Sequence, residues 1–146
     1  MVVYAKDFMT KEVVTIETTK SALDAAKLMA EREVGSLVIL QGGKPVGIVT
    51  DRDVVVRAVA KDLQLSGVKV GEIMSKPLVT VKLDTPMIEI AKIMDDRGVR
   101  RVPVVKGDEV VGIVTSSDMG RASKVLAPYL LPRIPEIYLT PKKRSG

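Results

Sequence analysis

The apolar residues of this chain form the same series of short elements twice, once in each half. Short runs rich in β-branched residues and bounded by turn-forming residues are typical of strands. In each half the second and third runs are separated by a Gly-Gly or Gly-Asp pair, which predicts a β-hairpin. The expected strands are 13–16, 36–40 and 45–50 in the first half and 78–81, 102–106 and 110–115 in the second.

Helices are predicted by apolar residues that recur at positions i, i+3, i+4 and i+7 after the first strand of each half. Thr85 and Pro86 form a favourable helix start, because a capping hydroxyl precedes a proline at the first helical position. We expect the Met/Ala stripe of these helices to pack between the two halves. A final helix is expected to begin at Asp51 and at Ser116. The stripe consists of Ala22, Ala25, Ala26 and Met29 in the first half and Met87, Ile90, Ala91 and Met94 in the second.

The two halves are related by an internal duplication. Residues 5–54 align with residues 70–119 at a constant offset of 65 without a gap, and sixteen of the fifty pairs are identical. Ordinary composition gives roughly three identities by chance. Two copies are too few for a solenoid, so we expect two similar halves packed face to face around a pseudo-two-fold axis. A site at their junction is then expected to occur twice.

These elements predict an α/β (α+β) fold built from two units of β-α-β-β-α order. We expect unit 1 at 1–62, a linker at 63–69, unit 2 at 70–127 and a proline-rich C-terminal arm at 128–146. The prolines of the arm, beginning with Pro128, disfavour a regular helix or a central strand. Its apolar residues predict an extended arm that packs on the body of the protein or on a partner subunit.

Composition indicates a folded protein of one compact domain. Of the 146 residues, 46% are hydrophobic and 28% are charged. No apolar stretch approaches the roughly 18 residues that a membrane span needs. The first residues lack the basic start and the apolar core of a signal peptide. Together with the absence of cysteine, these features predict a cytoplasmic protein without a membrane partner.

The chain contains neither histidine nor cysteine. Their absence excludes Ser-His and Cys-His nucleophiles, histidine metal clusters and histidine proton shuttles. Acid–base chemistry would have to rest on carboxylates or lysines alone. The sequence therefore predicts a protein that is not an enzyme and has no catalytic cofactor or metal site.

The formal net charge is +5 and the isoelectric point lies near 9.5. Proteins that bind nucleic acid concentrate such charge in a patch, and those that bind single strands add aromatic residues for base stacking. Here the positive charge is dispersed apart from residues 142–144, and aromatic residues make up only 3% of the chain. A dispersed basic surface is therefore the first interpretation, and a site for small anions such as phosphates fits the charge equally well.

A Thr-x-x-Asp motif follows the last strand of each unit, from Thr50 to Asp53 and from Thr115 to Asp118. One interpretation is a capping box, which stabilises a helix start by about 1 kcal/mol. The other is a binding site, because the N–H groups of a helix start attract phosphate and a carboxylate there can accept hydrogen bonds from ribose hydroxyls. The recurrence of the motif after the same strand favours the site, and both interpretations stay open at this point.

The sequence resembles a tandem pair of cystathionine-β-synthase (CBS) domains, an arrangement called a Bateman module. The resemblance covers about residues 5–126. It rests on the order of the elements, Met-Thr or Met-Ser near the start of each unit, Gly-Ile-Val-Thr-x-x-Asp, and Gly-Val-Arg-Arg-Val-Pro-Val-Val at 98–105. The family implies a sensor whose adenosyl ligands sit in two clefts between the paired units. AMP is the first expectation, with ADP, ATP or S-adenosylmethionine as further candidates.

The resemblance also implies a role for each matching position. Asp53 and Asp118 would hold ribose hydroxyls. Gly35 and Ser36 stand in the first unit where the second has two arginines, so we expect the Asp118 cleft to be the stronger phosphate site. The positions expected to face phosphate are Thr115, Ser117, Arg100 and Arg101 for the Asp118 cleft, and Thr50 and Arg52 for the Asp53 cleft.

An apolar slot across the pseudo-two-fold axis is expected to hold the base, which backbone groups would recognise. The same positions suit an ordinary core, and that alternative stays open. Arg52 and Arg57 either serve the Asp53 cleft or are solvated surface charges. The base pocket that the resemblance implies consists of Val14, Thr15, Val34, Gly35, Ser36, Ile48, Val79, Thr80, Val99, Val102 and Ile113.

We therefore expect a regulatory module that binds adenine nucleotides, forms a homodimer through its helix faces and acts as an energy or ligand sensor on an unknown partner protein. The alternative is a scaffold or nucleic-acid-binding protein on the same fold. In that alternative the Thr-x-x-Asp motifs serve only as helix caps.

Overall fold

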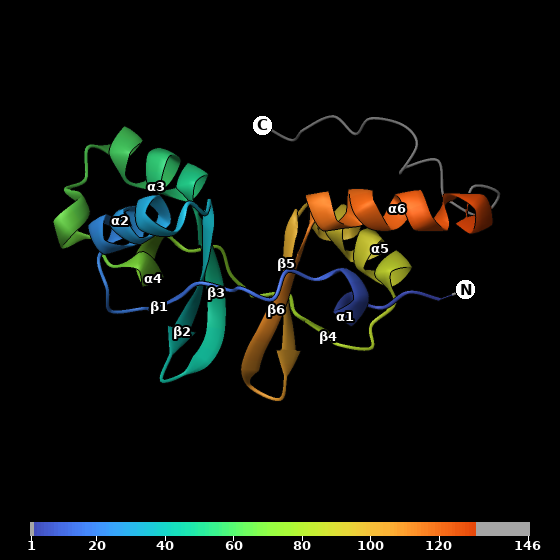
Figure 1. Cartoon of the computed structure of the whole chain (residues 1–146). Helices are drawn as coiled ribbons and strands as arrows, with labels where there is room; N and C mark the ends of the chain where they lie inside the picture. The colour runs from blue at the N-terminus through green and yellow to red at the C-terminus, as the bar shows by residue number, and fades with distance from the viewer. Residues whose placement is uncertain (1, 131–146) are drawn as a thin grey trace.

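The computed structural model describes residues 2–130 and contains two halves that lie side by side (Figure 1). Each half holds a three-stranded sheet, and the longer helices lie on the outer sides of the two sheets. The first copy forms α1 (Ala5–Phe8), β1 (Thr15–Glu17), α2 (Ala22–Arg32), β2 (Ser36–Gln41), β3 (Lys44–Thr50), α3 (Asp51–Arg57) and the 3₁₀ turns η1 (Val59–Lys61) and η2 (Leu65–Gly67). The second copy forms α4 (Val70–Ile73), β4 (Val81–Lys82), α5 (Met87–Arg97), β5 (Arg101–Lys106), β6 (Glu109–Thr115) and α6 (Ser116–Leu130).

The expected α+β class and the β-α-β-β-α order are present in both copies, and each copy also begins with a short helix that the pattern did not predict. In the first sheet β1 is parallel to β2, and β2 is antiparallel to β3; β4, β5 and β6 repeat this arrangement. The two hairpins lie within one residue of the expected bounds. The first strands begin later than expected, at Thr15 and Val81, because pairing with β2 and β5 begins only there.

The apolar stripe of each long helix packs against the sheet of its own half. Ala22, Ala25 and Met29 of α2 belong to one buried cluster with residues of β1, β2 and β3. Met87 and Ile90 of α5 belong to a second cluster with residues of β4, β5 and β6. The expectation that this stripe packs between the halves was wrong, because each sheet needs a helix to cover its own apolar face. The halves meet instead through β3 and β6.

A reciprocal hydrogen-bonded cap fixes the start of α2. The Ser21 backbone N–H donates to the Asp24 carboxylate (3.1 Å), and the Asp24 N–H donates to the Ser21 hydroxyl oxygen (3.0 Å). The bond from the Ser21 backbone, with a further contribution from its hydroxyl, holds the pKa of Asp24 below its ordinary value because it stabilises the charged carboxylate. The stabilisation from this cap is present at neutral pH and is lost as the pH falls through the lowered pKa.

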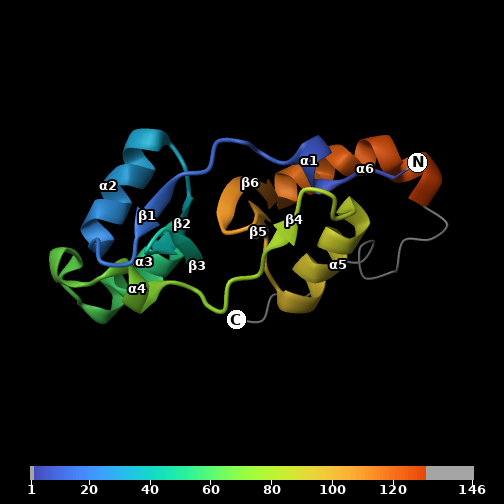
Figure 2. The same cartoon turned by 90° about the horizontal axis from the view of Figure 1, so that it is seen from below.

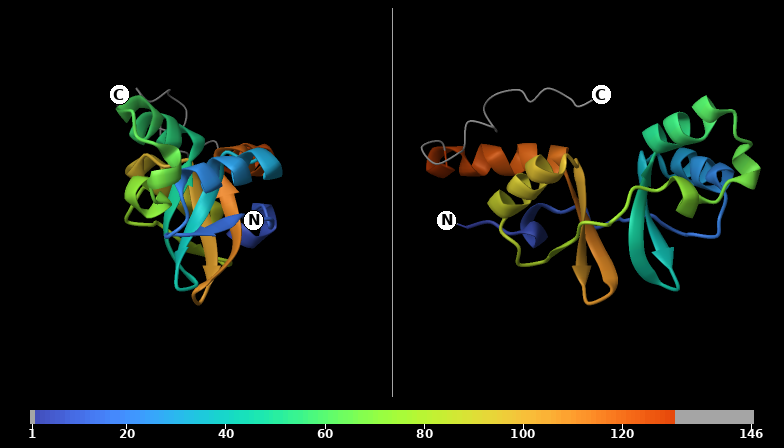
Figure 3. Two further views of the ribbon diagram at one scale, coloured as in Figure 1. Left: turned by 90° about the vertical axis from the view of Figure 1, so that its left-hand side faces the viewer. Right: turned by 180° about the vertical axis from the view of Figure 1, so that it is seen from behind.

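The start of each copy packs on the opposite half (Figures 2 and 3). Helix α1 contacts α6 and β6, whereas α4 contacts α2, α3 and β3. Ala5 of α1 is fully buried in the core of the second half, and Val70 and Ile73 of α4 are buried in the core of the first. Each core is thus completed by a four-residue helix from the other copy.

Backbone hydrogen bonds hold the two crossing segments against the inner strands. The N–H of Thr10 donates to the carbonyl of Ile113 (2.8 Å), and the N–H of Ile113 donates to the carbonyl of Thr10 (2.9 Å). Ser75 and Ile48 make the equivalent pair of bonds at 2.8 and 3.2 Å. Since these residues differ by the repeat offset, the contacts follow the expected pseudo-two-fold axis.

Two glycines let the crossing segments approach these strands closely. Gly112 of β6 lies under the Met9 side chain, and Gly47 of β3 lies under the Met74 side chain. A Cβ on Gly112 would collide with Met9 and would lie 3.1 Å from the Thr10 carbonyl oxygen. The identities of Met9 with Met74 and of Gly47 with Gly112 in the duplication therefore have a packing cause.

The last helix extends beyond the expected start of the C-terminal arm. α6 passes through Pro128 and ends at Leu130, so the expectation that this proline excludes a regular helix was wrong at its first position. A proline removes one backbone hydrogen bond from a helix, which the last turn tolerates better than the middle. The rest of the arm, at 131–146, lies outside the described residues. Among residues 2–130, none of the helices is long and apolar enough to cross a membrane.

We predict that Gly112→Ala lowers the free energy of unfolding by about 1–3 kcal/mol, because the new methyl group pushes the Met9–Thr10 segment away from β6. Denaturant unfolding measures this difference. Met9→Ala introduced together with Gly112→Ala is expected to restore part of the loss, since it removes the colliding side chain.

The matched control is Gly120→Ala in α6, where an added Cβ meets nothing within 4 Å. Alanine has the higher helix propensity, so this variant is expected to be as stable as the parent or up to about 1 kcal/mol more stable. Equal stabilities for Gly112→Ala and the parent protein would contradict the close packing of the crossing segment.

Candidate functional site

Both Thr-x-x-Asp motifs form helix caps. At the start of α3 the Thr50 N–H donates to Oδ2 of Asp53 (2.9 Å), and the Asp53 N–H donates to the Thr50 hydroxyl oxygen (3.1 Å). At the start of α6 the same two bonds join Thr115 and Asp118 at 2.8 and 3.2 Å. The capping interpretation is therefore confirmed. In both motifs the cap uses Oδ2 of the aspartate, so the surroundings of Oδ1 decide what else each carboxylate can bind.

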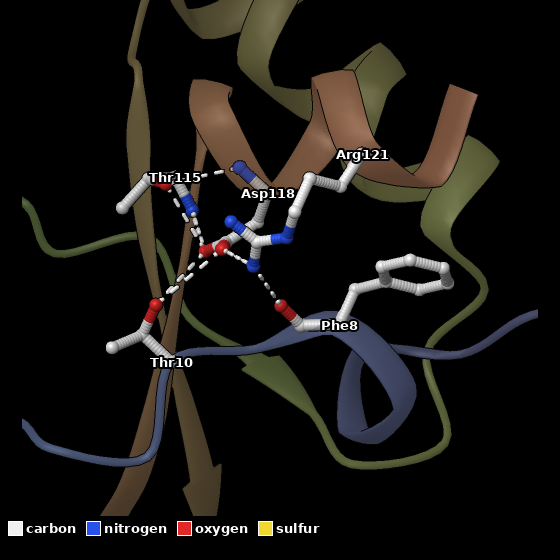
Figure 4. Close-up of polar contacts among 5 residues, drawn as sticks. All are labelled: Phe8, Thr10, Thr115, Asp118 and Arg121. Carbon is white, nitrogen blue, oxygen red and sulfur yellow. Dashed lines mark hydrogen bonds and ion pairs between the residues drawn. The ribbon is translucent and has the colours of Figure 1, made fainter. Parts of the chain in front are cut away.

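The Asp118 carboxylate lies inside a polar cluster (Figure 4). Its Oδ1 forms an ion pair with Arg121, and the Thr10 hydroxyl donates to both of its oxygens at 3.4 Å. Arg121 also donates to the Phe8 carbonyl oxygen (3.4 Å), and the Thr115 hydroxyl donates to Oδ2 (3.0 Å). Asp118 is only 1% exposed, so any ligand hydroxyl that reaches this carboxylate must displace Thr10 or Arg121.

The Asp53 carboxylate is more accessible, with 12% of its side chain exposed. Its Oδ1 lies 3.7 Å from Nε of Arg57, and Arg57 also donates to the carbonyl oxygens of Ile73 (3.0 Å) and Met74 (3.1 Å). Arg57 therefore joins the end of α4 to the Asp53 carboxylate, as Arg121 joins the end of α1 to the Asp118 carboxylate. The two arginines are not equivalent in the duplication, because they follow their aspartates by four and three residues.

A cleft of about 190 Å³ lies between the halves on the Thr115 side of the molecule. Apolar side chains of the first half form one part of its lining, and polar residues of both halves form the rest. The lining residues are Thr10, Glu12, Val13, Val14, Val34, Gly35, Ser36, Val38, Arg101, Ile113 and Thr115.

The cleft brings together seven of the residues expected from the sequence. They are Val14, Val34, Gly35, Ser36, Arg101, Ile113 and Thr115. The remaining ones do not line it. Of these, Asp118 and Val102 are buried, Ser117, Arg100, Arg52, Thr15 and Thr80 are exposed, and Thr50, Asp53, Ile48, Val79 and Val99 are half-buried.

The adjacent arginines at the start of β5 are divided between different surroundings. A guanidinium nitrogen of Arg101 reaches across to the first half, where it lies 3.6 Å from the point that a Cβ added to Gly35 would occupy. An oxygen of the Asp51 carboxylate lies 3.3 Å from the same position. Arg100 does not line this cleft, so only one of the two guanidiniums expected at the phosphate site lies there.

Four lining residues were not predicted from the sequence, and these are Thr10, Glu12, Val13 and Val38. Arg121 was not predicted either. The shared Met-Thr/Ser at the start of each unit was the available signal for Thr10. Nothing in the repeat pattern pointed to Arg121 or Glu12, because their equivalents are Val56 and Pro77.

Comparisons with known proteins agree with this architecture. A family model of the CBS domain matches residues 5–59 and again residues 70–124. The uncharacterized protein MK0525 of Methanopyrus kandleri is 36% identical over 128 residues, which are 86% of this chain and 63% of that protein. The chain thus spans less than two thirds of that relative's length.

Two solved structures are similar along most of the chain. The CBS domain pair of protein MJ0100, in complex with 5′-methylthioadenosine and S-adenosyl-L-methionine, has 31% identity and a TM-score of 0.76 over 86% of this chain and 98% of its own. The hexameric CBS-CP12 protein from bloom-forming cyanobacteria has 31% identity and a TM-score of 0.74 over 99% of this chain and 79% of its own. With two family matches in one chain and this fold, the protein belongs to the CBS-domain family as a tandem pair.

Proposed function

We propose that this CBS pair is a regulatory module that binds an adenosine-containing ligand in the cleft between its halves and has no catalysis of its own. The observation that carries the proposal is the composition of that cleft, where valines of the first half lie opposite Arg101 and Thr115 of the second. An apolar wall suits a purine base, and a guanidinium suits a carboxylate or phosphate at the other end of the ligand.

The ribose is the part of the ligand that the motif aspartates would hold. A carboxylate accepts hydrogen bonds from both hydroxyls of a ribose, as in dinucleotide-binding folds. At Asp118 this requires Thr10 to release its two long hydrogen bonds. At Asp53 the carboxylate is more exposed, and its only ionic partner in the described chain is 3.7 Å away. Both motifs are therefore proposed as ribose sites, with the one at Asp118 coupled to the crossing segment.

The ligand class is supported by a relative. The CBS pair of MJ0100 was crystallised with 5′-methylthioadenosine and S-adenosyl-L-methionine, which share the adenosine group. AMP, ADP and ATP share it too, and AMP is the first expectation from the family. We propose the adenosine group as the common determinant of binding and energy sensing as its use.

A ligand regulates a protein only by binding two conformations with different affinity. The Asp118 cluster offers such a difference, because it connects the cleft side of α6 to the crossing segment through Thr10 and Phe8. A ribose that replaces Thr10 on the carboxylate changes the contacts of that segment. We propose that a partner protein, or a further domain of a longer chain, responds to this change.

Self-association is proposed through the helices of the first half. Val55, Val56 and Val59 of the α3–η1 segment are 46–57% exposed, and Leu63 beside them is 45% exposed. Such a cluster of apolar side chains favours burial against a second copy. The similar CBS-CP12 protein is hexameric, which supports the proposal of self-association. We propose a homodimer as the basic unit.

The alternative remains a scaffold in which the motifs serve only as caps, and the observed caps give it a specific basis. The two functions differ in their response to adenosine compounds. A scaffold gains no stability from them, whereas a sensor is stabilised by every ligand that binds its folded state.

We predict that AMP, ADP, ATP, S-adenosylmethionine or 5′-methylthioadenosine raises the melting temperature of the protein. A ligand at 100 times its dissociation constant stabilises the folded state by about 2.7 kcal/mol. Thermal-shift scans followed by calorimetric titration measure the effect. If none of the five compounds shifts the melting temperature at millimolar concentration, the sensor function is wrong and the scaffold is favoured.

Asp53→Asn and Asp118→Asn are each predicted to weaken ligand binding about tenfold or more, because they replace charge-assisted hydrogen bonds to the ribose by neutral ones. Calorimetric titration of each variant measures the dissociation constant, and the melting temperature without ligand reports its stability separately. Asp84→Asn, at an exposed position before α5, is the control and is expected to bind like the parent. Unchanged binding by both motif variants would leave the aspartates with a capping role alone.

The double variant Val55→Asp and Val59→Asp is predicted to shift the protein from dimer to monomer, since it places charges in the apolar contact. Light scattering coupled to size-exclusion chromatography measures the mass. Val2→Asp, at a 59% exposed valine outside α3, is the control and should remain dimeric. An unchanged mass of the double variant would place the interface elsewhere.

A further inference from the structure

The charges around the cleft do not suit a polyphosphate. Glu12 and Arg101 both line it, from the crossing segment and from β5. The Asp51 carboxylate and the Arg101 guanidinium lie 3.3 and 3.6 Å from the point that a Cβ added to Gly35 would occupy. One guanidinium therefore stands against two carboxylates near the cleft, and neither forms an ion pair with it among the described residues.

The corresponding positions carry no carboxylate on the Asp53 side of the molecule. The duplication replaces Glu12 by Pro77 and Asp51 by Ser116, which removes both carboxylates. It replaces Gly35 by Arg100, Ser36 by Arg101 and Arg101 by Ser36. Since the Arg101 side chain lines the Glu12 cleft, Arg100 is the guanidinium left for the Asp53 side.

The backbone confirms that these positions correspond in space as well as in sequence. The Asp51 N–H donates to the Gly35 carbonyl (3.0 Å), and the Ser116 N–H donates to the Arg100 carbonyl (2.9 Å). The motif aspartates do not change the difference in charge between the two sides, since Asp53 pairs with Arg57 and Asp118 pairs with Arg121.

We propose that the two sides of the module select adenosyl ligands by charge, and that the Glu12 cleft takes a ligand whose 5′ substituent carries a cationic group. An adenosyl sulfonium or an adenosyl amino acid has this chemistry. Its cation lies near Glu12, and a carboxylate of the same ligand pairs with Arg101. Phosphate esters are accepted at the Arg100 side, where no carboxylate stands at the corresponding positions. The inference rests on the proposed function and adds the ligand class of each side.

Glu12 and Asp51 explain why the cleft is not simply cationic, although Arg101 lines it. A carboxylate near a guanidinium offsets its charge, so a phosphate gains less from that guanidinium. A second carboxylate nearby repels the phosphate directly. A ligand with both a cation and a carboxylate avoids both penalties, because each of its charges meets an opposite one.

The test compares S-adenosylmethionine with 5′-methylthioadenosine, which has the same adenosine group but no charge on its 5′ substituent. Calorimetric titration of the full chain gives the ratio of the two dissociation constants. Glu12→Gln is expected to weaken S-adenosylmethionine about tenfold and to leave 5′-methylthioadenosine within twofold. Glu109→Gln, at an exposed glutamate of β6 that does not line the cleft, should leave the ratio unchanged.

The other side is tested with ATP and the variant Arg100→Gly, which copies the residue of the first copy. This variant is expected to weaken ATP about tenfold and to leave S-adenosylmethionine within twofold. An unchanged ratio in Glu12→Gln, or an equal loss of both ligands in Arg100→Gly, would overturn the charge selection while adenosine binding itself stands. Failure of all three compounds to bind the parent protein would instead overturn the proposed function.

Discussion

The exchange of N-terminal segments between the two halves is the constraint on which the rest of this structure depends. Ala5 is buried in the core of the second half, and Val70 and Ile73 are buried in the core of the first. Neither three-stranded sheet is closed by its own copy alone, so the halves fold as one body. The closeness of the crossing segments also explains Gly47 and Gly112, where no side chain fits between strand and segment.

The same exchange places polar groups of the N-terminal segment at the junction of the halves. Thr10 follows α1, and its backbone pairs with β6. Its hydroxyl donates to the Asp118 carboxylate, a contact between residues 108 positions apart in the sequence. Arg121 fixes the arrangement by joining that carboxylate to the Phe8 carbonyl. A contact that completes the core thus also forms one side of the candidate ligand site. Ligand binding and the packing of the halves are linked through the same few hydrogen bonds.

The sequence pattern predicted the elements well, because their causes are local. Hairpins follow from glycine turns between apolar runs, and the last helices begin at Asp51 and Ser116 because the Thr-x-x-Asp caps fix them. What it missed is long-range. A four-residue helix is too short to show a periodic pattern, so α1 and α4 were not predicted. The apolar stripe of α2 predicts a buried helix face but does not identify the surface against which that face packs. The local propensity of Pro128 predicts a helix break, but the fifteen-residue helix α6 contains this proline near its C-terminal end.

The positions that are identical in the two copies do not distinguish the ligands of the two sides. Thr-x-x-Asp is needed in both copies for the caps, and Met9 with Gly112 is needed for the crossing, whatever the site binds. Residues without such a structural task are free to differ. Glu12 and Arg101 line the cleft, and their counterparts Pro77 and Ser36 are uncharged. Identity between the copies therefore reports the fold and whatever the two sides share, and the difference between their ligands has to be inferred from the positions at which the copies diverge.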